Sequence, residues 1–211
     1  MHWHIFDGTP RLLVQIATLF KRIHPLTLLL WLGLILVSVA LQWLGLVPEF
    51  RFDRSKIEAG QWFRLISANL VHLNAQHLLL NILGLGLVLV FFSDHLKTLQ
   101  WLSLLLVSSL AVTGGVYGFN PEINRYVGLS GVLHGLFIVA AMVEIKRFPL
   151  SGWILLSVLV AKLAWEQLNG AMPGSESMIN GHVVVDSHLY GALSGLCYGL
   201  VLTRRSWLRL L

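Results

Sequence analysis

The sequence predicts an all-α, polytopic membrane protein: a single bundle of six transmembrane helices. Of its 211 residues, 56% are hydrophobic and only 12% are charged, and the mean hydropathy is +0.74. These values lie far outside the range of ordinary soluble domains, so a lipid bilayer is the expected solvent. Apolar runs of about 20 residues, the length that a helix needs to cross the hydrocarbon, recur along the chain.

The six spans are placed where these runs occur, because backbone polar groups in lipid must be bonded within a helix. They are expected at 26–46, 68–92, 98–117, 129–146, 150–169 and 184–203. The two long connections are 47–67 and 170–183, and no linker or internal repeat divides the chain. Residues 26–203 are therefore predicted to form one membrane domain, between a segment at 1–25 and a basic tail at 204–211.

The first residues predict a short amphipathic helix over 9–23, lying on the membrane surface. Thr9 can cap this helix and Pro10 suits its first position. No cleavable signal is expected, because no apolar stretch with a small-residue cleavage site precedes the basic pair that follows. One face of the helix collects the apolar residues Leu12, Leu13, Ile16, Leu19 and Phe20.

Charge and cysteine content bear on the class of protein. The net charge is +5, but the basic residues form short clusters beside apolar runs rather than one stripe, which argues against a nucleic-acid partner. The single cysteine, Cys197, rules out an intrachain disulfide and is expected to be a small buried hydrophobe. Lipid is the expected partner.

The basic residues also predict the orientation, since cytoplasmic loops carry the excess of Lys and Arg. Placing both termini in the cytoplasm puts nine basic residues inside and five outside, while Lys162 lies within the fifth span. Those inside are Arg11, Lys21, Arg22, Lys97, Lys146, Arg147, Arg204, Arg205 and Arg209. Those outside are Arg51, Arg54, Lys56, Arg64 and Arg125.

Polar side chains inside a membrane are costly and tend to mark function. His77 and Asn81 are four residues apart, so they share one face near the outer end of the second span, where both can donate hydrogen bonds to one point. His72 is about half a turn out of phase with Asn81. It is therefore expected to precede the helix or face elsewhere, in a packing role.

Ser130 lies in the stretch G-L-S-G at 128–131, where a glycine-flanked loop becomes the fourth span and free backbone N–H groups remain. Taken alone, such a serine is usually a packing residue. His188 lies just inside the outer end of the sixth span. Small residues at four-residue spacing let two helices approach closely, which would bring Ser130 to His188. These are Gly131 and Gly135 in span four and Gly191, Gly195 and Gly199 in span six.

These motifs together resemble the rhomboid family of intramembrane serine proteases over nearly the whole chain. The matching residues are an outer loop with Trp62 and Arg64, H-x-x-x-x-H-x-x-x-N at 72–81, G-x-S-G at 128–131 and H-x-x-G-x-x-x-G at 188–195. The resemblance implies a six-helix fold and a Ser130–His188 dyad, supported by the flanking Gly128 and Gly131. It also implies an oxyanion hole made by His77, Asn81 and the Ser130 amide, with His72 as a structural histidine.

Two departures refine the resemblance. Phe63 separates Trp62 from Arg64, which are usually adjacent in rhomboids, and position 134 is histidine where bacterial rhomboids often carry a tyrosine stacked on the catalytic imidazole. G-L-S-G-V-L-H-G is similar to the rhombosortase branch, as is a short chain without a soluble N-terminal domain. That branch implies substrates ending in a Gly-Gly motif, an apolar helix and a basic tail, and a site that opens to the periplasm from a bacterial inner membrane.

Several alternatives stay open at this stage. His134 is interpreted as a packing residue, a ring stacked on or bonded to His188, or the base itself. The chain as a whole is alternatively a non-catalytic binder of membrane helices, or a metal or proton carrier using His72, His77, His134 and His188. We expect no cofactor and no metal.

Three further ionisable residues in or beside the spans receive structural interpretations. Asp186 is predicted to be a solvated residue at the start of its helix, pointing away from His188. The pair Lys162 and Glu166, four residues apart in the fifth span, is explained first by Lys162 extending toward the head groups. A role in the gating that this helix has in rhomboids is the alternative.

Overall fold

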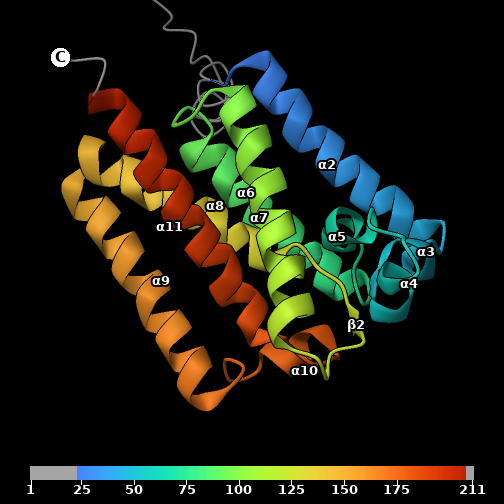
Figure 1. Cartoon of the computed structure of the whole chain (residues 1–211). Helices are drawn as coiled ribbons and strands as arrows, with labels where there is room; N and C mark the ends of the chain where they lie inside the picture. The colour runs from blue at the N-terminus through green and yellow to red at the C-terminus, as the bar shows by residue number, and fades with distance from the viewer. Residues whose placement is uncertain (1–22, 208–211) are drawn as a thin grey trace, which may run out of the picture.

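The computed structural model describes residues 23–207, which are mostly helical, and confirms the predicted all-α membrane fold (Figure 1). Four of the described helices are long and apolar enough to cross a membrane: α2, α6, α7 and α9. Two more long helices, α8 and α11, pack between them, and a count of six spans stays a prediction. The bounds are α2 Pro25–Trp43, α6 Ala75–Phe92, α7 Thr98–Phe119, α8 Ser130–Arg147, α9 Pro149–Asn169 and α11 Val185–Trp207.

Most helices begin and end within a few residues of the predicted bounds, but the second begins later than expected. Residues 68–70 form a short 3-10 turn, η1 (Ala68–Leu70), and α6 starts only at Ala75. The Asn74 side chain caps α6 by accepting a hydrogen bond from the backbone N–H of His77 at 3.0 Å. The expected start at 68 was therefore wrong, because this apolar segment forms a turn that supports the site.

At the chain ends, α11 continues to Trp207, into the predicted basic tail. Residues 1–22, which hold nearly all of the predicted amphipathic helix, and residues 208–211 lie outside the described part.

The long first connection packs against the end of the bundle near the site. It contains α3 (Val47–Phe50), β1 (Phe52–Asp53), α4 (Arg54–Glu58) and α5 (Arg64–Ser67), and β1 pairs antiparallel with β2 (Arg125–Tyr126). Arg64 is 3% exposed and donates hydrogen bonds to Gln61 Oε1 and to two backbone carbonyls, whereas Trp62 is 59% exposed. Arg64 rather than Trp62 therefore holds this connection together.

Helix α8 lies at the centre of the bundle, and ten of its 18 residues are buried. Its closest neighbour is α11, as the glycines predicted: a Cβ on Gly135 would lie 2.7 Å from the carbonyl O of Gly191, and one on Gly191 would collide with the carbonyl O of Gly131. Only glycine permits this approach. The predicted contact between the fourth and sixth long helices is thus confirmed.

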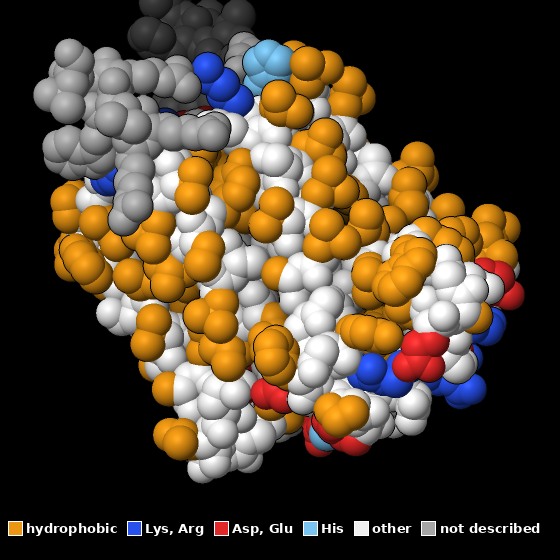
Figure 2. Space-filling view, in the orientation of Figure 1, with side chains coloured by type: hydrophobic (Ala, Val, Ile, Leu, Met, Phe, Trp, Pro, Cys, Tyr) orange, Lys and Arg blue, Asp and Glu red, His pale blue; other side chains and the backbone are white. Residues whose placement is uncertain are grey.

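The surface carries the features expected of a protein in lipid. On the face shown in Figure 2, hydrophobic side chains cover the middle, whereas charged side chains gather toward its upper and lower ends. Cys197 is exposed on α11, so the expectation that it is buried was wrong. In a membrane protein, the lipid-facing surface is apolar as well as the core, so a small hydrophobic side chain such as that of Cys197 is compatible with either.

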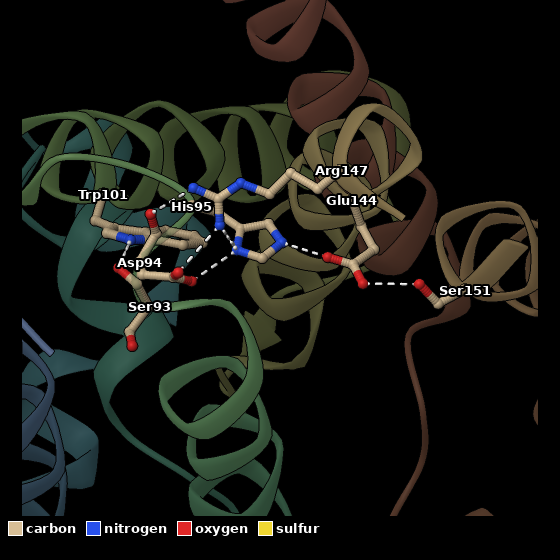
Figure 3. A network of polar contacts seen from close by, with 7 residues as sticks. All are labelled: Ser93, Asp94, His95, Trp101, Glu144, Arg147 and Ser151. Carbon is tan, nitrogen blue, oxygen red and sulfur yellow. Dashed lines mark hydrogen bonds and ion pairs between the residues drawn. The ribbon is translucent and has the colours of Figure 1, made fainter. Parts of the chain in front are cut away.

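A polar network closes the end of the bundle opposite the site (Figure 3). His95, in the turn between α6 and α7, bonds to Glu144 Oε2 of α8 at 2.7 Å through Nε2 and to Asp94 Oδ1 at 3.0 Å through Nδ1. Arg147 donates to Asp94, and Ser151 of α9 donates to Glu144. The network therefore joins the α6–α7 and α8–α9 turns.

Candidate active site

Ser130 and His188 are brought together although they are 58 residues apart in the chain. Ser130 is the first residue of α8, and His188 lies in the first turn of α11. The distance between His188 Nε2 and Ser130 Oγ is 3.0 Å, within hydrogen-bonding range. This is the contact that general-base activation of a serine hydroxyl requires.

His134 lies one turn after Ser130 on α8 and faces the same site. Its ring stacks on that of His188, with 4.3 Å between ring centroids and 21° between ring planes. Its Nδ1 lies 2.7 Å from the carbonyl O of Ser130 and can donate a hydrogen bond there. The His134 ring therefore lies against the face of the His188 imidazole rather than between that imidazole and the Ser130 hydroxyl.

His77 and Asn81 are both buried in α6 and line the same cavity as Ser130 and His188. Asn81 Nδ2 donates to the carbonyl O of His77 at 3.0 Å, and His77 Nδ1 lies 3.5 Å from the backbone N–H of Leu73. His72 precedes α6 and packs edge to face on His77, with ring centroids 5.1 Å apart. Within the described part of the chain, neither ring nitrogen of His72 has a hydrogen-bond partner, which agrees with a packing role.

Gly128 holds the backbone that leads into Ser130. Its φ of +120° is one that residues with side chains rarely adopt, and an added Cβ would lie 2.6 Å from His77 Cε1. Its N–H donates to the carbonyl O of Ala68, and its own carbonyl accepts from the Tyr126 hydroxyl at 3.1 Å. Burial raises the pKa of Tyr126 to about 12, so this hydroxyl stays a donor.

A cavity of about 630 Å³ connects these groups. Its lining includes the side chains of Ser130, His188, His77 and Asn81 as well as many apolar side chains. The short helix α10 (Ser175–Ile179) contributes to the wall, and Asn74 Nδ2 donates to the carbonyl O of Ile179. The cavity is large enough to hold a peptide segment beside Ser130.

Glu166 is the site residue that sequence reasoning missed. It is 2% exposed, and its Oε2 lies 2.9 Å from His188 Nδ1 and 2.7 Å from Lys162 Nζ. Lys162 therefore turns inward to an ion pair, and the expectation that it simply extends toward the head groups was wrong. The available signal was a carboxylate within an apolar span, which by default marks function.

Asp186 points away from His188, as expected, but it is not merely solvated. Its Oδ2 accepts a hydrogen bond from Asn120 Nδ2 at 2.6 Å, and Asn120 Oδ1 accepts one from the Tyr190 hydroxyl at 2.9 Å. Asp186 therefore joins the start of α11 to the end of α7.

One group of side chains in the site has the composition of a metal site. His134, Glu166 and His188 offer ligand atoms within 4.8 Å of one another. Two stacked imidazoles, however, direct their in-plane lone pairs side by side rather than toward one ion, and the Lys162 ammonium already occupies the carboxylate. The geometry fits a Ser–His–carboxylate arrangement better than a metal site.

Comparison with known proteins identifies the family. Residues 59–205 match the Rhomboid domain. The chain belongs to the rhomboid family. It is also 29% identical over 144 residues, 68% of this chain and 67% of the relative, to a Bacillus subtilis (strain 168) protein named "Putative rhomboid protease YdcA". Rhomboid proteins are serine intramembrane proteases, and this rhomboid is an integral membrane protein.

Proposed function

We propose that this rhomboid is a serine endopeptidase that cleaves membrane-anchored proteins, with Ser130 as nucleophile and His188 as general base. The observation that carries the proposal is the 3.0 Å contact between His188 Nε2 and Ser130 Oγ at the wall of the cavity. A non-catalytic binder of membrane helices would have no need of this contact. The stacked rings likewise disfavour a metal carrier.

In the proposed reaction, His188 Nε2 takes the proton of Ser130 while the Oγ electron pair forms a bond to the peptide carbonyl carbon. The carbonyl π electrons move to the oxygen, and we propose that His77, Asn81 and the Ser130 backbone N–H stabilise the resulting oxyanion. The oxyanion then reforms the carbonyl and the C–N bond breaks, while His188 gives its proton to the leaving amine. Water, activated by His188 in the same way, attacks the acyl carbon and breaks its bond to Ser130 Oγ, which regains its proton. Loss of one such oxyanion donor costs about 2.7–4 kcal/mol in acyl-transfer enzymes.

We further propose a rhombosortase-type substrate: a C-terminal signal made of a Gly-Gly motif, an apolar helix and a basic tail. The support is the similarity of G-L-S-G-V-L-H-G, at 128–135, to that branch. The distribution of basic residues supports both termini in the cytoplasm and therefore a site that opens on the opposite face of the membrane. In the bacterial inner membrane that the resemblance to this branch implies, that face is the periplasmic one. Reporters placed in 170–183 should be exposed outside, and reporters at the termini should be inside.

Reporter cleavage tests this proposal. A membrane reporter carrying the Gly-Gly signal is expressed with the wild type, Ser130→Ala or His188→Ala, at equal membrane levels. Both variants should insert normally and lose cleavage, and a reporter with the two glycines replaced by leucine should resist the wild type. Substantial cleavage by folded Ser130→Ala would refute the protease assignment, whereas equal cleavage of both reporters would refute only the substrate signal.

Substitutions of the two stacked histidines, His134 and His188, test which of them is the general base. We propose that His134 supports the His188 ring, so His134→Tyr should keep measurable cleavage while His188→Tyr keeps none. Loss of all cleavage in His134→Tyr together with activity in His188→Ala would reverse the assignment.

A further inference from the structure

The carboxylate of Glu166 lies against the nitrogen of His188 that does not face Ser130. His188 Nε2 contacts Ser130 Oγ at 3.0 Å, and His188 Nδ1 contacts Glu166 Oε2 at 2.9 Å. The side chains of His188 and Glu166 are 7% and 2% exposed, so water has little access to this contact. Three groups on three helices, α8, α11 and α9, therefore form one hydrogen-bonded chain.

Two arrangements of the His188 proton compete, because Lys162 Nζ lies 3.5 Å from the same Nδ1. An ammonium can only donate, so bonding to Lys162 would leave Nδ1 without a proton and place the ring proton on Nε2, where it blocks base function. The contact with Glu166 is shorter, 2.9 Å against 3.5 Å. Lys162 Nζ also has a closer acceptor in Glu166 Oε2, at 2.7 Å. The distances thus favour a proton on Nδ1 and a free lone pair on Nε2.

Lys162 offsets part of the energetic cost of burying the Glu166 carboxylate. An unpaired carboxylate in a low-dielectric interior is strongly disfavoured, and a nearby cation offsets part of that penalty. The Lys162 side chain is 31% exposed, so it can bring a charge to Glu166 while it stays partly accessible. Lys162 therefore holds Glu166 as a hydrogen-bond acceptor for His188.

We infer that Glu166 is a positioning residue for the proposed protease reaction: it holds His188 in the tautomer that can accept the Ser130 proton. The inference rests on the proposed function and extends the predicted dyad by a carboxylate. When the Ser130 proton moves to Nε2, the ring becomes an imidazolium, and the carboxylate stabilises its charge without taking a proton itself. His134 occupies the ring face and leaves both nitrogens to these partners.

The chain offers a matched control at the opposite end of the bundle. His95 Nε2 and Glu144 Oε2 are 2.7 Å apart, also between a buried imidazole and a carboxylate on a neighbouring element (Figure 3). A Glu→Gln change at either position removes one such pair, but only Glu166 contacts the proposed base. Glu144→Gln therefore reports the cost of losing a structural His–Glu pair.

The test compares kcat and KM for reporter cleavage by the full chain in proteoliposomes. Glu166→Gln should lower kcat by about 100-fold or more at nearly unchanged KM, because a carboxamide can donate to Nδ1 and favour the wrong tautomer. Glu166→Asp should recover part of the activity, and Glu144→Gln should keep the wild-type kcat. If Ser130→Ala is inactive but Glu166→Gln is as active as Glu144→Gln, the inference about Glu166 is overturned. If Ser130→Ala is itself active, the proposed function is overturned instead.

A second measurement needs no Glu166 variant and so does not depend on its folding. Nitrogen-15 NMR of histidine-labelled wild-type protein, with the His188 signals assigned by their loss in His188→Gln, distinguishes a protonated from a bare ring nitrogen. We expect a proton on Nδ1 and none on Nε2. The opposite tautomer would overturn the inference, because it corresponds to the hydrogen bond from Lys162.

Discussion

Replacing Gly191 with alanine tests how closely α8 and α11 must approach for the site to work. A Cβ at this position would collide with the backbone carbonyl O of Gly131, well inside the 3.4 Å at which ordinary van der Waals contact begins. A backbone carbonyl cannot rotate away as the end of a flexible side chain can. Helix α11 must therefore move away from α8 by roughly 1 Å.

The size of the effect follows from the position of the base. His188 lies three residues before Gly191, nearly one turn away and on a similar face of α11, so the shift lengthens the 3.0 Å contact with Ser130. Misplacing a catalytic group by about 1 Å can lower a rate by about 100-fold, and overpacking costs about 1–3 kcal/mol. We expect Gly191→Ala to lose about 100-fold in kcat/KM with a modest fall in Tm.

The assay is reporter cleavage in proteoliposomes at equal protein levels, with thermal unfolding recorded in parallel. Gly86→Ala, in α6, is the matched control because nothing lies within 4 Å of a Cβ added there. It should keep wild-type activity. If Gly191→Ala cleaves as fast as Gly86→Ala, close packing of α8 and α11 does not set the geometry of the site.

Three further changes have defined outcomes. Gly128→Ala puts a side chain at φ +120° against a neighbouring imidazole, so reporter cleavage should fall by about 100-fold. Arg64→Ala removes a buried guanidinium that donates to the carbonyls of Pro48 and Arg51 and should lower the free energy of unfolding by about 1–3 kcal/mol, measured by denaturant titration. Burial raises the pKa of Asp94, but hydrogen bonds from His95 and Arg147 outweigh it and hold that pKa below 3.8. The stabilisation by these hydrogen bonds to the Asp94 carboxylate is therefore complete above about pH 4 and lost in stronger acid. Asp94→Asn cannot titrate at this position and should show a smaller acid-induced fall in Tm.

The contact between Ser130 and His188 could be predicted because regularly spaced glycines indicate which faces of two helices pack together. Gly131 and Gly135 on one helix and Gly191 and Gly195 on the other recur every four residues, which fixes the face that each helix presents. Both helices also enter the predicted membrane from the same side, which fixes the depth of their first turns. Face and depth together were enough to pair the two residues.

Glu166 could not be placed in the same way. Its position in α9 was known, but the rotation of that helix depends on packing, and α9 has no glycine repeat to report it. The i,i+4 spacing of Lys162 and Glu166 fits an ion pair at the membrane surface as well as one inside the bundle. Only the contact of Glu166 with His188 distinguishes the two, and it joins residues 22 apart in the chain.

The start of α6 was misplaced for a different reason. Residues 68–74 include Ala68, Leu70, Val71 and Leu73 and run directly into an apolar stretch, so composition alone extends the helix through them. Their backbone instead serves the site: the carbonyl O of Ala68 accepts from Gly128, and Asn74 caps the helix that follows. Tertiary hydrogen bonds of this kind leave no periodic signal in the sequence.

The most direct test of the central claim is the location of a covalent adduct formed by a fluorophosphonate, a reagent that reacts with activated serine hydroxyls. Mass spectrometry of the labelled, folded protein should find one adduct, on Ser130. Labelling should disappear in His188→Ala and after denaturation, because the hydroxyl is activated only while His188 Nε2 lies 3.0 Å away. An adduct on another serine, or equal labelling of Ser130 in His188→Ala, would contradict the assignment of Ser130 as nucleophile and His188 as its base.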